Sequence, residues 1–124
     1  MQPISIDGTF KTPAIKADAD KGSIEVRGRS NPENAPDFYK PLLNWVDEYI
    51  KKPAPQTTII IEMEHFNTSS SKVLLNMFRR LEAIPGSDKN VIVDWHYEAD
   101  DEDERETGEY YQKMTNIAFK FTGI

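Results

Sequence analysis

The residues of this chain best suited to chemistry form one polar run, Asn67-Thr68-Ser69-Ser70-Ser71-Lys72. It places four consecutive hydroxyl residues between an asparagine and a lysine. Asn, Thr and Ser are also preferred at helix N-termini, where one such side chain satisfies a free backbone N–H. A single hydroxyl is enough for that purpose, so the surplus needs a second explanation. The run is therefore consistent either with a helix cap alone or with a phosphorylation or ligand site, where backbone N–H groups and the helix dipole favour a phosphate.

Two enzymatic interpretations of the same run are weaker. Ser69 and Lys72 fit the Ser-x-x-Lys pattern of penicillin-recognising enzymes, but the companion motifs Ser-Asp-Asn and Lys-Thr-Gly are absent and the chain is too short for that fold. A small Ser/Thr hydrolase would need His65 or His96 beside one of the hydroxyls, and nothing in the sequence places a base there. We therefore expect no catalytic residue and no enzymatic activity, with the hydrolase as the less favoured alternative.

A strongly acidic segment follows later in the chain. Between Glu98 and Glu109 there are eight acidic residues and one arginine, a local charge of −7 in a chain whose formal net charge is −6. The remainder is nearly balanced and has no Lys/Arg cluster, so we expect no nucleic-acid binding. The segment lacks the spacing and glycine of a calcium loop. Three interpretations of the segment are considered: a solvated helix start, a partner-facing surface or a cation site. The solvated helix start is favoured, and we therefore predict neither a metal nor a cofactor for the chain.

The polar run must lie where a strand turns into a helix. Thr58–Phe66 contains three consecutive isoleucines, a continuous apolar pattern that predicts a strand covered on both faces. After the run, apolar residues recur at the three-and-four spacing of an amphipathic helix: Val73, Leu74, Met77, Phe78 and Leu81. The hydroxyls are thus expected at a helix N-terminus.

The elements before this corner begin with short strands and turns in residues 1–30. Ala14–Ala17 and Ser23–Gly28 are predicted to form a hairpin, because a turn signal separates two strand-like segments. A helical face then runs from Phe38 to Tyr49 and contains Pro41. Proline removes a helical hydrogen bond, so we expect either a turn followed by a helix beginning near Pro41 or one kinked helix.

The elements after the corner alternate in type. Val91–Tyr97 is predicted to be a strand, and the acidic segment begins a third helix whose Tyr110, Tyr111 and Met114 are expected to face the core. Residues 117–122 alternate apolar and polar side chains, which predicts a half-exposed strand near a sheet edge.

These elements predict an α/β fold, a mixed β-sheet flanked by helices in the order β-β-β-α-β-α-β-α-β, within one domain spanning residues 1–124. Cysteine is absent, which fits a reducing compartment. There is no signal-peptide pattern and no apolar run long enough to span a membrane, so a cytoplasmic location without membrane contact is expected.

Several short motifs occur together in a recognisable order along nearly the whole chain. They are Thr12-Pro13, Pro32-Glu33-Asn34, the polar run 67–72, Trp95, Tyr97-Glu98, Asp100, Glu106 and Gly108-Glu109. In this combination the chain resembles the SiaC family of bacterial regulatory phosphoproteins, and the polar run is the most specific element of the resemblance.

The resemblance implies a fold similar to the STAS domain of anti-sigma factor antagonists, in which a corner hydroxyl residue is reversibly phosphorylated. It assigns the phosphorylation to Thr68, with Ser69 as the fallback, and assigns partner binding to Asn67, Thr68, Ser69, Ser70, Ser71 and Lys72. In systems of this family a protein kinase adds the phosphate and a PP2C-type phosphatase removes it. The resemblance therefore implies that the unphosphorylated form binds and activates a diguanylate cyclase, which raises cyclic di-GMP and promotes biofilm formation.

The alternative output is that of an anti-sigma factor antagonist. In those proteins an aspartate usually precedes the phosphorylated serine, whereas here Asn67 precedes Thr68.

Overall fold

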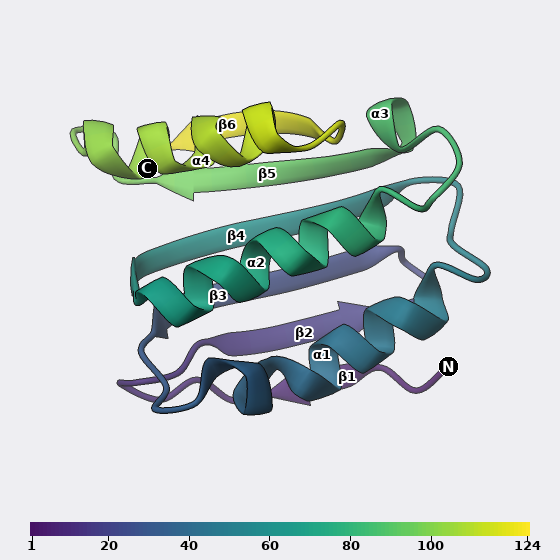
Figure 1. The fold of residues 1–124 in the computed structure, drawn as a ribbon, viewed down its shortest axis with the longest axis horizontal. Coiled ribbons are helices and arrows are strands. Elements are labelled where there is room, and N and C mark those ends of the chain that lie inside the picture. Colours follow the sequence, from purple (N-terminus) through teal and green to yellow (C-terminus); the bar gives the residue numbers. More distant parts are fainter.

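The chain forms one six-stranded sheet with its helices packed on one face (Figure 1). The computed structural model describes all residues from 1 to 124. The strands are β1 (Ile4–Ile6), β2 (Ala14–Asp18), β3 (Ser23–Ser30), β4 (Thr57–Phe66), β5 (Val91–Tyr97) and β6 (Ala118–Gly123). The helices are α1 (Ala35–Tyr49), α2 (Thr68–Leu81), the short α3 (Ser87–Asn90) and α4 (Glu102–Met114). The predicted mixed sheet flanked by helices is confirmed.

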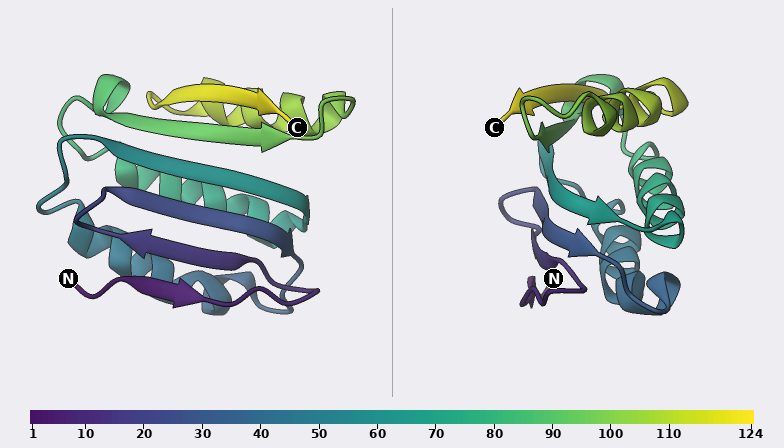
Figure 2. Two further views of the ribbon diagram at one scale, coloured as in Figure 1. Left: turned by 180° about the vertical axis from the view of Figure 1, so that it is seen from behind. Right: turned by 90° about the vertical axis from the view of Figure 1, so that its left-hand side faces the viewer.

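The strands lie in the sheet in the order in which they occur in the chain. β1, β2 and β3 pair antiparallel, which confirms the predicted hairpin, and β3 to β6 pair parallel. Each parallel connection steps to the next strand in the same direction, so right-handed crossovers put every helix on the same side. Figure 2 shows this arrangement, with helices on one side of the sheet and the other side bare.

The prediction that Thr58–Phe66 is covered on both faces is wrong. Within β4, Ile59 and Ile61 are fully buried, whereas Ile60 between them is only partly buried on the bare face. The continuous isoleucine run concealed this alternation, because β-branched residues favour strands on a solvated face as well as on a buried one.

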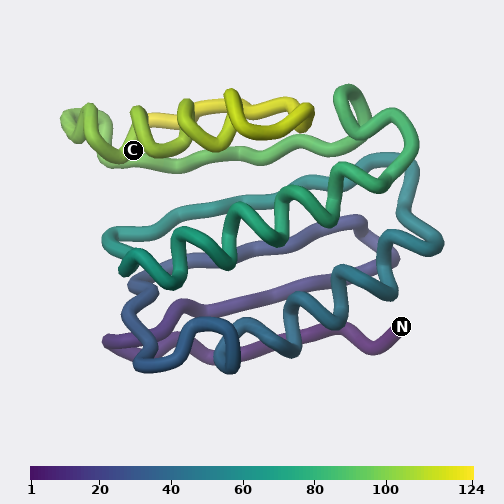
Figure 3. The backbone as a smooth tube through the Cα atoms, viewed as in Figure 1, coloured from purple at the N-terminus to yellow at the C-terminus, as the bar shows by residue number.

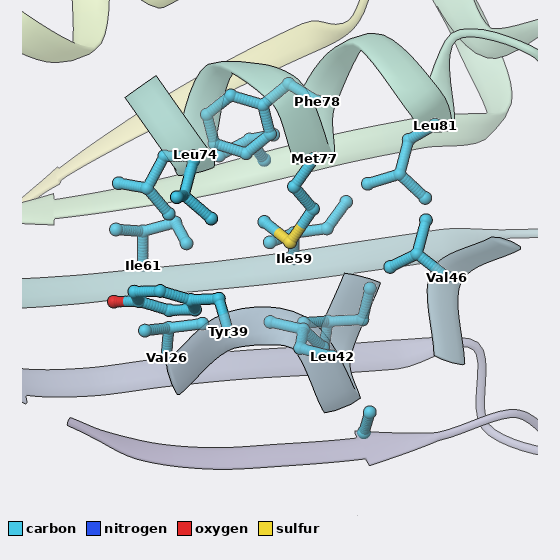
Figure 4. Packing of buried hydrophobic residues seen from close by; sticks show 14 of the residues in the cluster. Val26, Tyr39, Leu42, Val46, Ile59, Ile61, Leu74, Met77, Phe78 and Leu81 are labelled. Carbon is cyan, nitrogen blue, oxygen red and sulfur yellow. The ribbon is translucent and has the colours of Figure 1, made fainter. Parts of the chain in front are cut away.

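The core lies between the sheet and the helices. Figure 4 shows Leu74, Met77, Phe78 and Leu81 of α2 above Ile59 and Ile61 of β4. Residues of α1 complete this layer above β3, among them Tyr39, Leu42 and Val46. Buried apolar side chains of these elements belong to one cluster of 24 residues. The amphipathic pattern of α2 was therefore predicted correctly.

The structure corrects two local predictions and adds one element. α1 is a single helix from Ala35 to Tyr49 that includes Pro41, not a turn followed by a helix starting there. Three residues of α4 were expected to face the core. Tyr111 is buried, but the prediction is wrong for Tyr110, which is 53% exposed, and for Met114, which is 39% exposed. Tyr110 directly precedes Tyr111 and therefore points to another side of the helix, whereas Met114 is the last residue of α4. The short helix α3 was not predicted.

The three helices that follow β3, β4 and β5 all begin at the same end of these parallel strands. β3 leads into α1, β4 into α2 and β5 into α4, so all three helices begin beside the carboxyl ends of these strands. The trace in Figure 3 shows these three strand-to-helix turns at the same end of the molecule. β1 and β6 form the two opposite edges of the sheet, as expected for the last strand. No helix combines the length and apolar character needed to cross a bilayer.

Candidate functional site

The polar run occupies the turn from β4 into α2, as predicted. Asn67 is the N-cap of α2, and its side-chain oxygen accepts a hydrogen bond from the Ser70 backbone N–H at 2.9 Å. Its amide nitrogen donates to Asn31 Oδ1 and to the Pro32 carbonyl, both at 3.2 Å. Its backbone N–H donates to the Ser30 carbonyl at 2.9 Å. Asn67 therefore caps α2 and also anchors it to the segment that precedes α1.

Ser70 is fully buried and belongs to a hydroxyl network. Ser30 Oγ donates to Ser70 Oγ at 2.7 Å, and Ser70 Oγ donates to the Ser30 carbonyl at 3.3 Å. Because the single hydroxyl proton of Ser30 is used in this way, the Tyr39 hydroxyl must donate to Ser30 Oγ, at 2.5 Å. Burial raises the pKa of Tyr39 to about 12, so this phenol stays neutral. The network joins α2 to β3 and α1.

Ser71 ties the other side of the helix start to α4. The Tyr111 hydroxyl donates to the Ser71 carbonyl at 3.0 Å, and Ser71 Oγ lies 2.9 Å from the same hydroxyl. Burial raises the pKa of Tyr111, and the hydrogen bond with Ser71 acts against that rise. The sequence did not identify three residues that hold these serines: Ser30, Tyr39 and Tyr111. Ser30 and Tyr111 each lie 40 residues from the serine that they contact, and Tyr39 reaches Ser70 only through Ser30.

The four hydroxyls are thus divided into two pairs with different roles. Ser70 and Ser71 are engaged inside the structure, whereas Thr68 and Ser69 are exposed and make no side-chain hydrogen bond. Ser70, which was predicted to contact a partner, has no accessible surface in this structure. Thr68 is the first residue of α2, beside backbone N–H groups that have no partner within the helix.

A cleft of about 420 Å³ separates Thr68 from the start of α4. We call it the acidic cleft, because its lining includes the carboxylates of Glu64, Asp101, Asp103 and Glu104. Glu64 lies 3.6 Å from Arg29, while the other three form no ion pair. Burial raises the pKa of Glu104, and the charges of Asp101, Glu98 and Glu64 add to this effect. The acidic segment therefore faces the corner across this cleft.

Asp101 explains why this segment begins a helix. It is the N-cap of α4, and its side chain accepts a hydrogen bond from the Glu104 backbone N–H at 3.1 Å. Acids in the first turn complement the helix dipole, as predicted. The titratable side chains of the molecule form no cluster of three that could hold a metal ion.

The histidines do not form a catalytic arrangement with the corner. His96 lies on the bare face of the sheet, where Nδ1 is 3.0 Å from Glu62 and Nε2 is 3.2 Å from Asp94. Both ring nitrogens therefore face carboxylates, and neither serves a hydroxyl of the polar run. His65 borders the acidic cleft, but no hydrogen bond joins it to Thr68 or Ser69. The arrangement thus offers an accessible, unengaged threonine without a general base.

Comparison with known proteins gives a consistent result. The model of the SiaC family of regulatory phosphoproteins matches residues 6–124. An uncharacterized protein of Pseudomonas aeruginosa, strain UCBPP-PA14, is 27% identical over 119 residues, which are 96% of this chain and 94% of that protein.

Two solved structures from Pseudomonas aeruginosa resemble this fold throughout. Apo-SiaC is 26% identical with a TM-score of 0.86, over 98% of this chain and 99% of that one. A chain from the crystal structure of the diguanylate cyclase SiaD in complex with its activator SiaC is also 26% identical. Its TM-score is 0.89, with the same coverage of both chains.

Proposed function

Because the chain belongs to the SiaC family of regulatory phosphoproteins, we propose that it activates a diguanylate cyclase and that phosphorylation of Thr68 prevents this activation. The proposal rests on the difference between the two engaged and the two free hydroxyl residues at the turn from β4 into α2. Thr68 is the exposed, unengaged hydroxyl at the very start of α2, in a fold shared with an activator of a diguanylate cyclase. Cyclic di-GMP production, and with it biofilm formation, is the proposed output.

Accessibility supports Thr68 as the modified residue. A kinase must bring the hydroxyl oxygen to the γ-phosphate of ATP, which requires a side chain free of internal hydrogen bonds. Ser70 and Ser71 do not meet this requirement, because both are held by internal partners. Ser69 is exposed like Thr68 and is the fallback site.

Charge supports the inhibitory effect of the phosphate. A phosphothreonine adds about −1.5 to −2 charge at neutral pH. At Thr68 that charge adds to a surface that already carries the four carboxylates of the acidic cleft. A partner that closely contacts this corner would have to desolvate the phosphate or clash with it. Binding is then lost without any need for the domain to refold.

The remaining parts of the scheme are two enzymes that set the phosphorylation state. We propose a protein kinase and a PP2C-type phosphatase as the other partners, with the chain itself acting as a non-enzymatic component. We propose a cytoplasmic location, where the kinase has ATP and the cyclase has GTP. Asn67, Ser69, Ser71 and Lys72 surround Thr68 and complete the proposed binding surface.

The experiment is a reconstituted cyclase assay. Purified diguanylate cyclases from the source organism are incubated one by one with GTP, with and without the unmodified chain. We expect cyclic di-GMP synthesis by one of them to rise with the chain and to return to its basal rate after kinase treatment. Intact-mass spectrometry should then show one adduct of about 80 Da, the mass of a phosphate group, mapped to Thr68. Failure of every cyclase to respond would refute the proposal, as would hydrolytic turnover by the chain alone.

A further inference from the structure

Ser69, the residue that follows Thr68, lines a second depression, between α1 and α2. Its volume is about 240 Å³, and we call it the α1–α2 groove. It is lined by Pro36, Leu43, Ser69, Lys72, Val73 and Asn76. Its floor is therefore aliphatic, and Ser69 and Lys72 form part of its rim. The groove begins beside the proposed phosphorylation site.

The charge around this groove differs from that of the whole chain. α2 contains three basic residues, Lys72, Arg79 and Arg80, and no acidic residue, although the chain has a net charge of −6. Arg80 is neutralised by Asp47 at 2.9 Å. Lys72 and Arg79 are exposed and form no ion pair, and two helical turns separate them, so both lie on the same side of α2.

Two of the three carboxylates of α1 are paired with other cations, because Asp47 contacts Arg80 at 2.9 Å and Glu48 lies 3.1 Å from Lys51. Asp37 accepts a hydrogen bond from the neutral Asn34 side chain and keeps its charge, but it forms no ion pair with Lys72 or Arg79. The exposed ridge of α2 therefore presents two free positive charges above an apolar groove. The opposite side of the corner presents the acidic cleft.

We propose that the α1–α2 groove docks an acidic amphipathic helix of the partner cyclase, a proposal that rests on the proposed function and names the chemistry of its partner. Apolar side chains of that helix enter between Leu43 and Val73, and flanking Asp or Glu residues pair with Lys72 and Arg79. A groove between two helices suits a helical ligand with one apolar side. Charge complementarity selects an acidic ligand over a basic one.

This placement explains how a phosphate at Thr68 acts on a groove that begins at the next residue, Ser69. Thr68 lies four residues before Lys72, a spacing that makes them neighbours on the same helix face. The phosphate is repelled by the carboxylates of the acidic cleft and attracted by Lys72. It thereby neutralises the positive rim of the groove and repels an acidic partner helix.

The test uses calorimetry to measure how tightly charge-reversal variants of the chain bind the diguanylate cyclase that the wild-type chain activates. Lys72→Glu and Arg79→Glu should each weaken binding by about tenfold, and raising the salt concentration should weaken wild-type binding more than theirs. Lys72→Arg should keep wild-type affinity. Lys113→Glu, an equal charge change on exposed α4, is the matched control and should change affinity by less than about twofold. Equal affinities of Lys72→Glu, Arg79→Glu and Lys113→Glu would overturn the proposal.

A second probe is independent of the cyclase. A synthetic amphipathic helix of about fifteen residues, with leucines on one side and glutamates on the other, is titrated into the ¹⁵N-labelled chain. We expect the backbone amide resonances of Leu43, Ser69 and Asn76 to shift when the peptide binds. The Thr68→Glu variant should bind the peptide more weakly than the wild-type chain. The same peptide with lysines in place of glutamates should not bind there. Equal binding of the two peptides, or no shift at these residues with either, would refute the docking site.

The two probes separate this inference from the function it rests on. If no cyclase is activated, the proposed function fails and the peptide titration still decides whether the groove binds acidic helices. If a cyclase is activated but the α2 variants bind it normally, the function stands and the inference fails. A dimer of the chain, measured by light scattering and dissolved by Lys72→Glu, would show that a second copy occupies the groove and would also overturn the proposal.

Discussion

Replacing Ser70 by alanine should destabilise the protein, although Ser70 is one of four similar neighbours. Ser30 Oγ donates to Ser70 Oγ, and Ser30 and Ser70 are both fully buried. Without Ser70, the Ser30 hydroxyl proton can only turn toward Tyr39, and the Tyr39 proton then loses its acceptor. Whichever way the two hydroxyl protons turn, one buried O–H group has no acceptor, which costs about 1 to 3 kcal/mol.

Thr68→Ala is the matched control for this experiment. Both substitutions remove a hydroxyl from the first turn of α2 and gain a similar helix propensity, so their difference isolates the buried hydrogen bond. Thr68→Ala should change the free energy of unfolding by less than about 0.5 kcal/mol, because its side chain is exposed. For a domain of this size, the difference corresponds to a melting temperature lower by about 3 to 15 °C for Ser70→Ala.

Urea unfolding followed by tryptophan fluorescence measures both variants. The double variant Ser30→Ala/Ser70→Ala should lose less stability than the sum of the two single variants, by about 1 kcal/mol, because each single variant leaves one buried O–H without an acceptor and the double variant also leaves only one, that of Tyr39. Equal unfolding free energies for Ser70→Ala and Thr68→Ala would refute the division of the hydroxyls into engaged and free pairs. Additive single losses would refute the network.

Three further predictions concern the frame that supports the corner. Gly108→Val should destabilise the protein by about 1 to 3 kcal/mol in thermal unfolding, because a Cβ at Gly108 would lie 2.7 Å from Trp95 and 2.8 Å from Phe121; an unchanged melting temperature would contradict this packing. The hydrogen bond from His96 lowers the pKa of Glu62. At Asp94, burial acts to raise the pKa, but hydrogen bonds from Thr122 and His96 outweigh it and leave the pKa lowered. Stability from these carboxylates is therefore present above their unfolded pKa values and lost as the pH falls below about 4. The stability difference between wild type and His96→Ala should shrink between pH 5 and pH 3, and a constant difference would argue against the network. Because burial raises the pKa of Tyr39 to about 12, its absorbance change should come late in an alkaline titration, and stability should fall as the pH rises from 10 toward 12; Tyr39→Phe should reduce the late phase, to which Tyr111 also contributes, and an unchanged late phase would contradict the burial of Tyr39.

The sequence predicted the elements and the corner well, because both depend on local patterns. The spacing of Leu74, Met77 and Phe78 is enough to define the buried side of α2, and Asn67 belongs to the residue types preferred at helix N-caps. The one-sided sheet was not predictable from the isoleucines of β4. It follows from the strand order, which depends on pairings between distant segments.

The division of labour among the hydroxyls was also hidden in the sequence. Thr68, Ser69, Ser70 and Ser71 are equivalent as helix-start residues, and only the family resemblance selected Thr68. The structure distinguishes them through Ser30, Tyr39 and Tyr111, which come from three other elements. The groove beside Ser69 likewise requires α1 and α2 to pack together.

The most direct test of the central claim compares the phosphorylated and unmodified chains with the same cyclase. The two forms, separated after kinase treatment and verified by intact mass, are titrated into the cyclase while affinity and cyclic di-GMP synthesis are recorded. The unmodified chain should bind and activate. The Thr68-phosphorylated chain should bind at least about tenfold more weakly and leave the cyclase at its basal rate. Equal affinity and equal activation by the two forms would contradict the switch.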